Sequence, residues 1–229
     1  MSKEYDAILH FACERGYINI VKYALENGAE PTSDSNWAIR IACANGYVDI
    51  VALLLPYKLV DPTVYNNWAI RTASKHGHAK VVSLLLQDER VDPTAEDNEA
   101  IREACEHGYV SVVEALLKDG RADPSAHNNF AIQYACADGD LKIVKALLQD
   151  GRADPRASNN WPLRTACLNG YKKIVEALLQ DGRIDTTDDY ESAFNTATKE
   201  IKEMLFAYKY RVDGQEYCKA KNDLTTLDR

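Results

Sequence analysis

The stretch Asn129–Arg156 reads NFAIQYACADGDLKIVKALLQDGRADPR and decides the fold, because its pattern recurs along the chain every 31 residues. Three residue types mark this period: Asn36, Asn67, Asn98, Asn129 and Asn160; Pro31, Pro62, Pro93, Pro124 and Pro155; and Gly46, Gly77, Gly108, Gly139 and Gly170. Self-similarity at a period of about 20 to 50 residues is typical of a solenoid, in which each unit packs only against its neighbours. This organisation favours an extended binding surface over a catalytic pocket.

Each repeat is predicted to contain two helices. Asn129 is a suitable N-cap, and apolar residues within Ala131–Cys136 follow the helical period. Gly139 supplies the left-handed residue that a tight turn needs. A second helix places the apolar residues of Ile143–Leu148 on one face. Asp154-Pro155 then begins an extended connector, because the residue before a proline avoids helical geometry.

Six such units and a degenerate seventh make up the predicted all-α solenoid, which spans residues 1–208. The repeats begin near residues 5, 36, 67, 98, 129, 160 and 191. The seventh unit lacks the turn glycine, so it requires either a very tight turn or one bent helix. Residues 209–229 are predicted to form a polar tail, because they lack apolar periodicity.

The repeat resembles the ankyrin-repeat family. The first unit reads Leu9-His10-x-Ala12-x-x-x-Gly16, the sixth keeps Pro162-Leu163 at the family's T-P-L-H position, and Leu25–Glu30 is similar to the family's L-L-x-x-G-A-D ending. The resemblance covers roughly residues 5–208 and implies binding of partner proteins on the concave side. The period of 31 residues is shorter than the family's usual 33 or so. We therefore expect shortened, proline-led connectors with little or no strand in place of the family's β-finger.

Composition excludes several classes of partner and site. The 229 residues carry a formal net charge of −8, which argues against nucleic-acid and anionic-membrane binding. No apolar run approaches the roughly 20 residues of a membrane span, and no signal-peptide pattern is present. We expect an intracellular and most simply cytoplasmic protein. Five cysteines share one core position, and no two of the six lie at zinc-ligand spacing, so we expect no metal and no cofactor.

An arginine column recurs near an aspartate column. It could form a phosphate- or carboxylate-binding row, or an internal ladder that joins each connector to a first helix. We favour the ladder, because a ligand-binding row needs no matched acid in every repeat. The proposed ladder residues are Arg40, Arg71, Arg102 and Arg164 with Asp61, Asp92, Asp123 and Asp154.

An aromatic column lies at the start of the first helices, at Trp37, Trp68, Phe130 and Trp161, and Glu99 interrupts it. Tryptophan is enriched in interface hot spots, which favours a recognition role. Regular spacing favours packing instead, since a recognition surface usually varies between repeats. Packing is the preferred interpretation, and recognition stays open.

Two sets of variable positions are better candidates for recognition. The slot that follows the arginine column holds Ile41, Thr72, Glu103, Tyr134 and Thr165, and the connector tips include Tyr65 and His127. Variation over a constant frame is how one scaffold displays a particular surface.

These patterns predict a non-catalytic, monomeric scaffold that binds another protein through its concave face. The chain carries no phosphate loop, no H-E-x-x-H and no G-x-S-x-G motif, and we expect no enzyme. One alternative is an adaptor whose repeats select a target while the C-terminal tail recruits an enzyme complex. Another is a self-associating structural protein.

Overall fold

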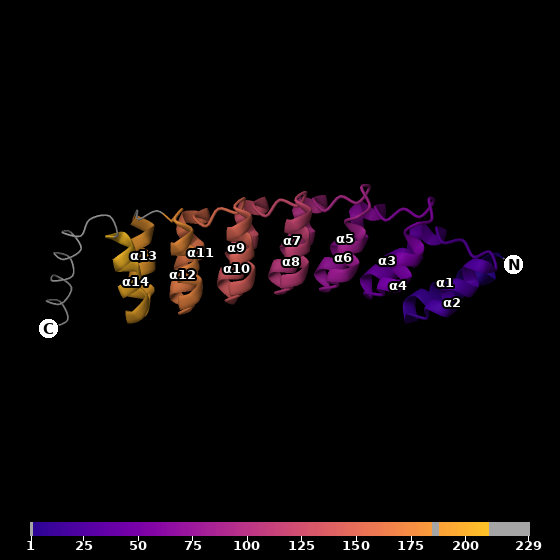
Figure 1. Ribbon diagram of the computed structural model, residues 1–229, viewed down its shortest axis with the longest axis horizontal. Helices are drawn as coiled ribbons and strands as arrows, with labels where there is room; N and C mark the ends of the chain where they lie inside the picture. Colours follow the sequence, from indigo (N-terminus) through magenta and orange to yellow (C-terminus); the bar gives the residue numbers. More distant parts are fainter. Residues whose placement is uncertain (1, 185–187, 211–229) are drawn as a thin grey trace. The chain divides into compact units, whose positions relative to one another are not determined.

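The computed structural model describes residues 2–184 and 188–210, and all regular structure in these ranges is helical (Figure 1). The helices are α1 (Ser2–Arg15), α2 (Ile18–Glu26), α3 (Ser33–Ala44), α4 (Val48–Leu54), α5 (Val64–Lys75), α6 (Ala79–Leu85), α7 (Ala95–Glu106), α8 (Val110–Asp119), α9 (Ala126–Asp138), α10 (Leu141–Asp150), α11 (Ala157–Leu168), α12 (Lys172–Asp181), α13 (Asp188–Thr196) and α14 (Lys199–Lys209). The all-α prediction is confirmed, and the connectors between 2 and 184 contain no strand.

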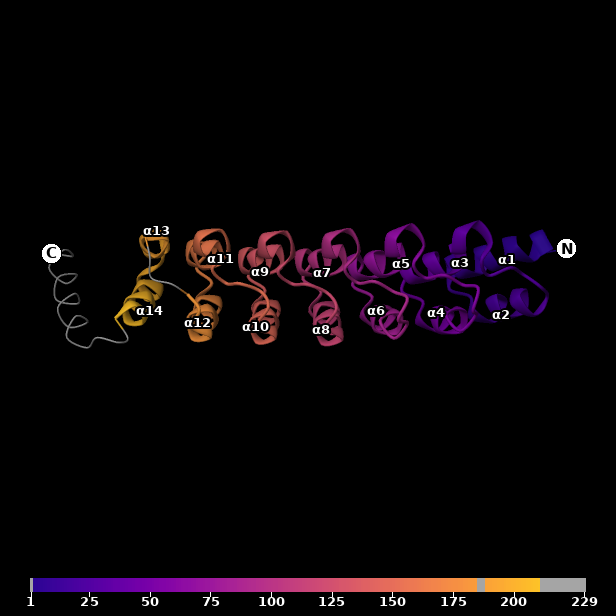
Figure 2. The same cartoon turned by 90° about the horizontal axis from the view of Figure 1, so that it is seen from above.

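The chain forms two compact units, residues 1–131 and 132–229, whose boundary falls within α9. In the first unit, α1, α3, α5 and α7 lie side by side in one layer, and α2, α4, α6 and α8 form a second layer (Figure 2). In the second unit, α11 packs against α13, and α12 packs against both α10 and α14. Within each unit, first helices therefore contact their own second helices and a neighbouring first helix, as in α1–α2 and α1–α3 or α13–α14 and α11–α13, as a solenoid requires.

The predicted core stripe is buried. Ile143, Val144 and Leu147 are completely inaccessible to solvent, and Leu148 is half-buried. The recurrent cysteines Cys13, Cys43, Cys105, Cys136 and Cys167 are free thiols in this core. Burial raises the pKa of Cys13 and of Cys167 to about 12. These thiols are therefore packing residues rather than nucleophiles.

The five connectors that lead to α3, α5, α7, α9 and α11 contain an unusual left-handed turn. In α3, Asp34, Ser35 and Asn36 have φ values of 49, 56 and 59°, so the right-handed helix begins only at Trp37. The same three-residue turn occurs at Tyr65–Asn67, Glu96–Asn98, His127–Asn129 and Ser158–Asn160. A left-handed helical conformation costs about 1–2 kcal/mol per non-glycine residue, and asparagine and aspartate tolerate it best. The abundance of these two residue types in the turns follows from that preference.

The last helical pair resolves the question of its missing glycine in favour of a tight turn. Only Ala197 and Thr198 separate α13 from α14, and the Thr198 hydroxyl accepts a hydrogen bond from the backbone N–H of Ile201. The predicted tail begins within α14, which ends at Lys209. Residues 211–229, including Cys218, lie outside the described residues.

Candidate interaction surface

The arginine column stabilises the left-handed turns. Arg40 donates to the carbonyl oxygens of Ser35 and Asp34, at 3.0 and 3.2 Å. Arg71 donates to the corresponding carbonyls of its own turn at 3.2 and 3.0 Å, and Arg102 does so at 2.9 and 3.2 Å. Each guanidinium thus satisfies two carbonyls that the turn leaves without helical partners.

The asparagine column joins consecutive repeats. Asn36 directly precedes the right-handed part of α3, but its side-chain oxygen accepts from the backbone N–H of Asp61 in the next connector, at 2.8 Å. Asn67 and Asn98 accept in the same way from residues 92 and 123, at 2.8 and 2.6 Å. Conventional N-capping, the sequence-based expectation for this column, is therefore not the role that these three side chains have.

The predicted arginine–aspartate ladder requires correction for Arg40, Arg71 and Arg102. In the described repeats these arginines hold left-handed turns, whereas the aspartates close turns of their own. The carboxylate of Asp61 accepts from the N–H and the hydroxyl of Thr63 at 2.8 and 2.7 Å, and Asp92 and Asp123 do the same with Thr94 and Ser125. The Asp-Pro-Thr/Ser sequence favours this local turn, because an aspartate readily bonds the backbone two residues on. Asp154 instead accepts from the side chain of Arg156, at 3.0 Å.

The aromatic column lies between neighbouring repeats, and all its members are half-buried. His10 packs against Trp37 with the two rings tilted by 42° and their centroids 4.7 Å apart. The guanidinium carbon of Arg40 lies 5.6 Å from the Trp68 ring, and that of Arg102 lies 5.8 Å from the Phe130 ring. Both distances permit cation–π attraction. These contacts favour the packing interpretation of the column.

The slot residues Ile41, Thr72, Glu103, Tyr134 and Thr165 are half-buried on the first helices. Glu103 forms an ion pair with Lys75 at 3.2 Å, and its carboxylate lies 3.7 Å from His107 Nδ1. The Thr72 carbonyl, but not its side chain, bonds His76. In the first unit the slot therefore offers a charged side chain, Glu103, together with the apolar Ile41 and the hydroxyl of Thr72.

The connector tips are the most accessible of the predicted site residues. Tyr65 is 60% exposed, and the His127 side chain is 55% exposed. Both belong to left-handed turns; Arg71 donates to the Tyr65 carbonyl, whereas Gln133 takes the arginine position in the repeat of His127. His127 lies 3.8 Å from the Asp97 carboxylate in the adjacent turn, and Asn66 donates to Glu96 at 2.6 Å. Adjacent tips therefore form a continuous polar edge in the first unit.

A second recurrent arginine interaction, which we call the Asp-x-Arg clamp, was not predicted from the sequence. In it an arginine pairs with the aspartate two residues earlier and donates to a carbonyl of the preceding connector. Arg90 forms a forked pair with Asp88, and its remaining amino group donates to the Val60 carbonyl in the preceding connector at 2.9 Å. Arg121 repeats this arrangement with Asp119 and Val91. Arg183 repeats it with Asp181 and Ala153. The recurrence of Asp-x-Arg at 31-residue spacing was the available signal.

The comparisons with known proteins place this geometry in a family. Residues 2–66 and 101–188, more than half of the chain, match the family model for ankyrin repeats in three copies. The chain belongs to the ankyrin-repeat family.

Several solved structures have this ankyrin fold. An ankyrin repeat domain from Acinetobacter baumannii is 21% identical, with a TM-score of 0.60, covering 76% of this chain and 97% of that one. The human ASB11 ankyrin repeat domain is 20% identical, with a TM-score of 0.66 and coverages of 87% and 96%. The ankyrin repeat domain of Bcl-3, a member of the IκB family, is 21% identical, with a TM-score of 0.68 and coverages of 86% and 96%. None of the curated proteins matches the sequence. Identity at this level supports the fold alone.

Ankyrin-repeat domains generally mediate protein–protein interaction and are typically non-catalytic. Within residues 2–184 and 188–210, no three histidine, cysteine, aspartate or glutamate side chains are grouped so that they could hold a metal ion. No helix in this part of the chain combines the length and the apolar character needed to cross a bilayer.

Proposed function

We propose that this ankyrin-repeat protein binds a partner protein through its first-helix surface. In the first unit this surface consists of the slot residues Ile41, Thr72 and Glu103 with the exposed tips Tyr65 and His127, and Tyr134 and Thr165 hold the equivalent slot positions in the second unit. It corresponds to the concave side that the family uses for recognition. The proposal does not assign recognition to the aromatic column.

The division of labour between recurrent and variable side chains supports this site. The recurrent arginine, asparagine and aspartate side chains described above bind backbone groups or neighbouring turns, and the aromatic rings pack between repeats. The slot and tip residues vary over this constant frame and keep accessible side-chain surface. A partner that bound here would meet side chains on a preorganised backbone, which reduces the ordering cost of association.

The test uses substitutions that add bulk and charge without removing a framework contact. Thr72→Arg and Thr165→Arg are preferable to a change at Glu103, whose carboxylate is paired with Lys75. The matched controls are Ser83→Arg and Ser111→Arg, at exposed positions of the second helices α6 and α8. All four proteins should melt within a few degrees of wild type before they are used.

Affinity capture from native lysate, with quantitative mass spectrometry, then compares the five proteins. A partner held by wild type and both serine variants but lost by both threonine variants supports the first-helix surface. Loss in the serine variants alone would move the site to the second helices. A chain truncated after Tyr210 tests the adaptor alternative, which predicts that one partner is lost while another is retained.

A further inference from the structure

Rings of one repeat pack onto the turn glycine of the repeat before it. A Cβ atom added to Gly16 would lie 2.7 Å from the Tyr47 ring, and one added to Gly77 would lie 2.8 Å from the Tyr109 ring. Gly46 meets His78 in the same way, and Gly139 meets Tyr171. Real Cβ contacts are not this short, so each ring occupies space that only a glycine leaves open.

Two of these rings also form a hydrogen bond to the preceding repeat. The Tyr47 hydroxyl donates to the Glu14 carbonyl at 3.4 Å, and His78 Nε2 donates to the Ala44 carbonyl at 2.9 Å. In both cases the accepting carbonyl lies two residues before the glycine. The stacking interface therefore has a defined chemistry: a ring with a polar edge meets a turn glycine and the carbonyl at the end of a first helix.

Tyr17 occupies the ring position of the first repeat, but no earlier turn glycine precedes it in residues 1–229. Its side chain is 50% exposed. Ile20, three residues on, is 38% exposed, whereas the equivalent residues of the next five repeats are only 0–2% exposed: Ile50, Val81, Val112, Ile143 and Ile174. The first repeat thus retains the apolar residues of a stacking face on the side where a terminal repeat needs polar ones.

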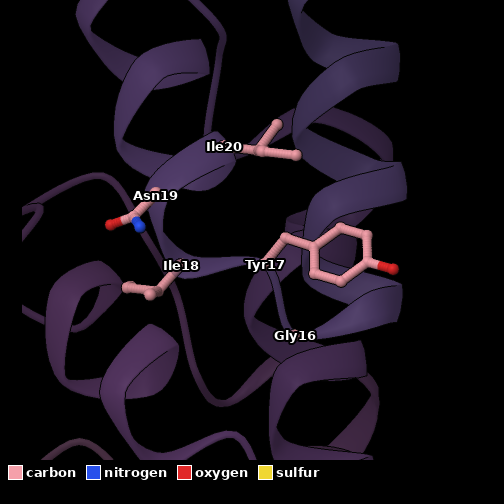
Figure 3. Close-up of a pocket in the computed structure, with 5 residues that line it drawn as sticks. All are labelled: Gly16, Tyr17, Ile18, Asn19 and Ile20. Carbon is pink, nitrogen blue, oxygen red and sulfur yellow. The ribbon is translucent and has the colours of Figure 1, made fainter.

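The surface around Tyr17 extends this apolar character. Phe11 lies 6.2 Å from Tyr17 between ring centroids, and both Phe11 and Tyr23 are about half exposed. Gly16–Ile20 line a hollow of about 420 Å³, and Figure 3 shows the side chains of Tyr17 and Ile20 extending to one side of this segment and those of Ile18 and Asn19 to the other. Exposed aromatic groups that adjoin a hollow are typical of an interaction site.

We propose that this N-terminal stacking face, formed by Phe11, Tyr17, Ile20 and Tyr23, binds a helix–turn–helix repeat from outside residues 1–229. The bound repeat presents a turn glycine to the Tyr17 ring and a first-helix carbonyl to its hydroxyl. The contact continues the interface that already joins repeats within the chain. Tyr17 and Ile20 lie outside the first-helix surface, although Phe11 holds the repeat position of Ile41, so a variant at Ile20 tests this proposal separately from the first.

A second copy of the chain fits this face less well. Gly16, Gly46, Gly77 and Gly139 already receive rings from their own following repeats. A Cβ atom at Gly170 would lie 3.9 Å from the methyl group of Thr198, so the turn before α14 faces this glycine. At these five of the six turn glycines a side chain of the following repeat already fills or contacts the position, so we take the complementary glycine to come from a repeat outside residues 1–229.

The experiment measures binding to a designed array of three consensus ankyrin repeats that has a polar N-terminal cap and an open glycine turn at its C-terminal end. The matched probe is the same array with a polar C-terminal capping repeat over that glycine. The full chain is tested as wild type, Ile20→Lys and Leu168→Lys by titration calorimetry and by size-exclusion chromatography with light scattering. Leu168 is the control because it is also exposed (66%) but lies in α11, away from the first repeat in sequence.

We expect a 1:1 complex of the wild type with the open array, at least tenfold weaker binding by Ile20→Lys, and unchanged binding by Leu168→Lys. The capped array should not bind. Absence of binding to the open array, equal binding of both arrays, or an Ile20→Lys variant that binds like wild type would overturn the proposal. Dimerisation of the chain alone that Ile20→Lys abolishes would also overturn it, because the occupant would then be a second copy.

Discussion

The Nε atom of Arg71 lies 2.8 Å from Oε2 of Glu99, at the place where Arg40 and Arg102 meet an aromatic ring of the following repeat. Both side chains of the pair are largely shielded from solvent, with 17% and 25% of their surface exposed. Glu99, which interrupts the aromatic column, therefore still contacts the arginine of the preceding repeat, but through a salt bridge. An ion pair replaces cation–π attraction between the third and fourth repeats.

Replacing Glu99 by alanine should lower the free energy of unfolding by about 1 kcal/mol, because Arg71 loses a partly buried charged acceptor. Glu99→Trp should cost less, since it restores the ring found in neighbouring repeats. Urea denaturation of Arg71→Gln, Glu99→Ala and the double variant measures the coupling directly. The exposed pair Lys172–Glu200 is the control and should show no measurable coupling. Strict additivity at Arg71 and Glu99 would contradict the assignment.

Asn67 contributes to stability in two ways: it tolerates the positive φ of the left-handed turn, and its side chain accepts a hydrogen bond from the next connector. Asn67→Gly keeps a residue that tolerates positive φ but removes the oxygen that accepts from the backbone N–H of Asp92. Asn67→Ala removes both, and it should destabilise the protein by about 1 kcal/mol more than Asn67→Gly. The midpoints of urea unfolding provide the comparison. Equal midpoints for the two variants would mean that the turn is not strained at this position.

The helices and their core were predictable because they depend on local periodicity. The spacing of Ile143, Val144 and Leu147 defines a buried face, and Gly139 marks the turn without knowledge of the neighbouring repeat. The left-handed turns were not predicted, because three consecutive residues of this conformation need support from outside the turn. That support comes from an arginine five or six residues later and, through Asn36, from the next repeat.

The same reason explains the error over Arg40 and Asp61. The two columns recur together in sequence, but recurrence does not identify partners in space. Aspartate had a local alternative in Thr63, and arginine had free carbonyls in its own turn. The slot and tip residues stay a prediction, since their variation alone does not reveal a partner.

Alanine at Gly77 should be far more damaging than alanine at Gly120. Both glycines have positive φ, 75° and 84°, so both substitutions impose backbone strain. Only at Gly77 does the new methyl group meet a ring, that of Tyr109 at 2.8 Å, whereas nothing lies within 4 Å of the corresponding position at Gly120. We expect a loss of about 1 kcal/mol for Gly120→Ala and about 2–4 kcal/mol for Gly77→Ala, measured by chemical denaturation. Similar losses at the two sites would show that ring packing adds nothing.

The core thiols should resist alkylation while the protein is folded. Desolvation raises the pKa of Cys13 and of Cys167 to about 12, and burial also raises the pKa of Cys43 and of Cys136. At pH 8 a pKa of about 12 leaves on the order of 10⁻⁴ of the thiol as the reactive thiolate. Labelling with a chromogenic disulfide should be slow in buffer and complete in guanidinium chloride. Cys218→Ser serves as the background, and rapid native labelling of any remaining thiol would contradict this prediction.

Acid should weaken the Asp-x-Arg clamps. Hydrogen bonds from the arginine two residues on hold the pKa of Asp88, Asp119 and Asp150 below its ordinary value. Because the folded pKa is the lower one, these carboxylates contribute stability above the unfolded pKa of about 3.9, and this contribution is lost as the pH falls through the folded pKa. Asp140 acts in the opposite sense, since desolvation and Asp138 raise its pKa.

We expect the urea midpoint to fall as the pH is lowered from about 5 to 2. The variant Asp119→Asn/Asp150→Asn should be less stable at pH 7, because its clamps lose the charged acceptor, and its midpoint should change less with acid. The control Asp49→Asn alters an exposed aspartate outside the clamps and should follow the wild-type curve. If the double variant lost stability as steeply as wild type below pH 4, the clamps would not be the acid-sensitive element, and other carboxylates would have to account for the transition.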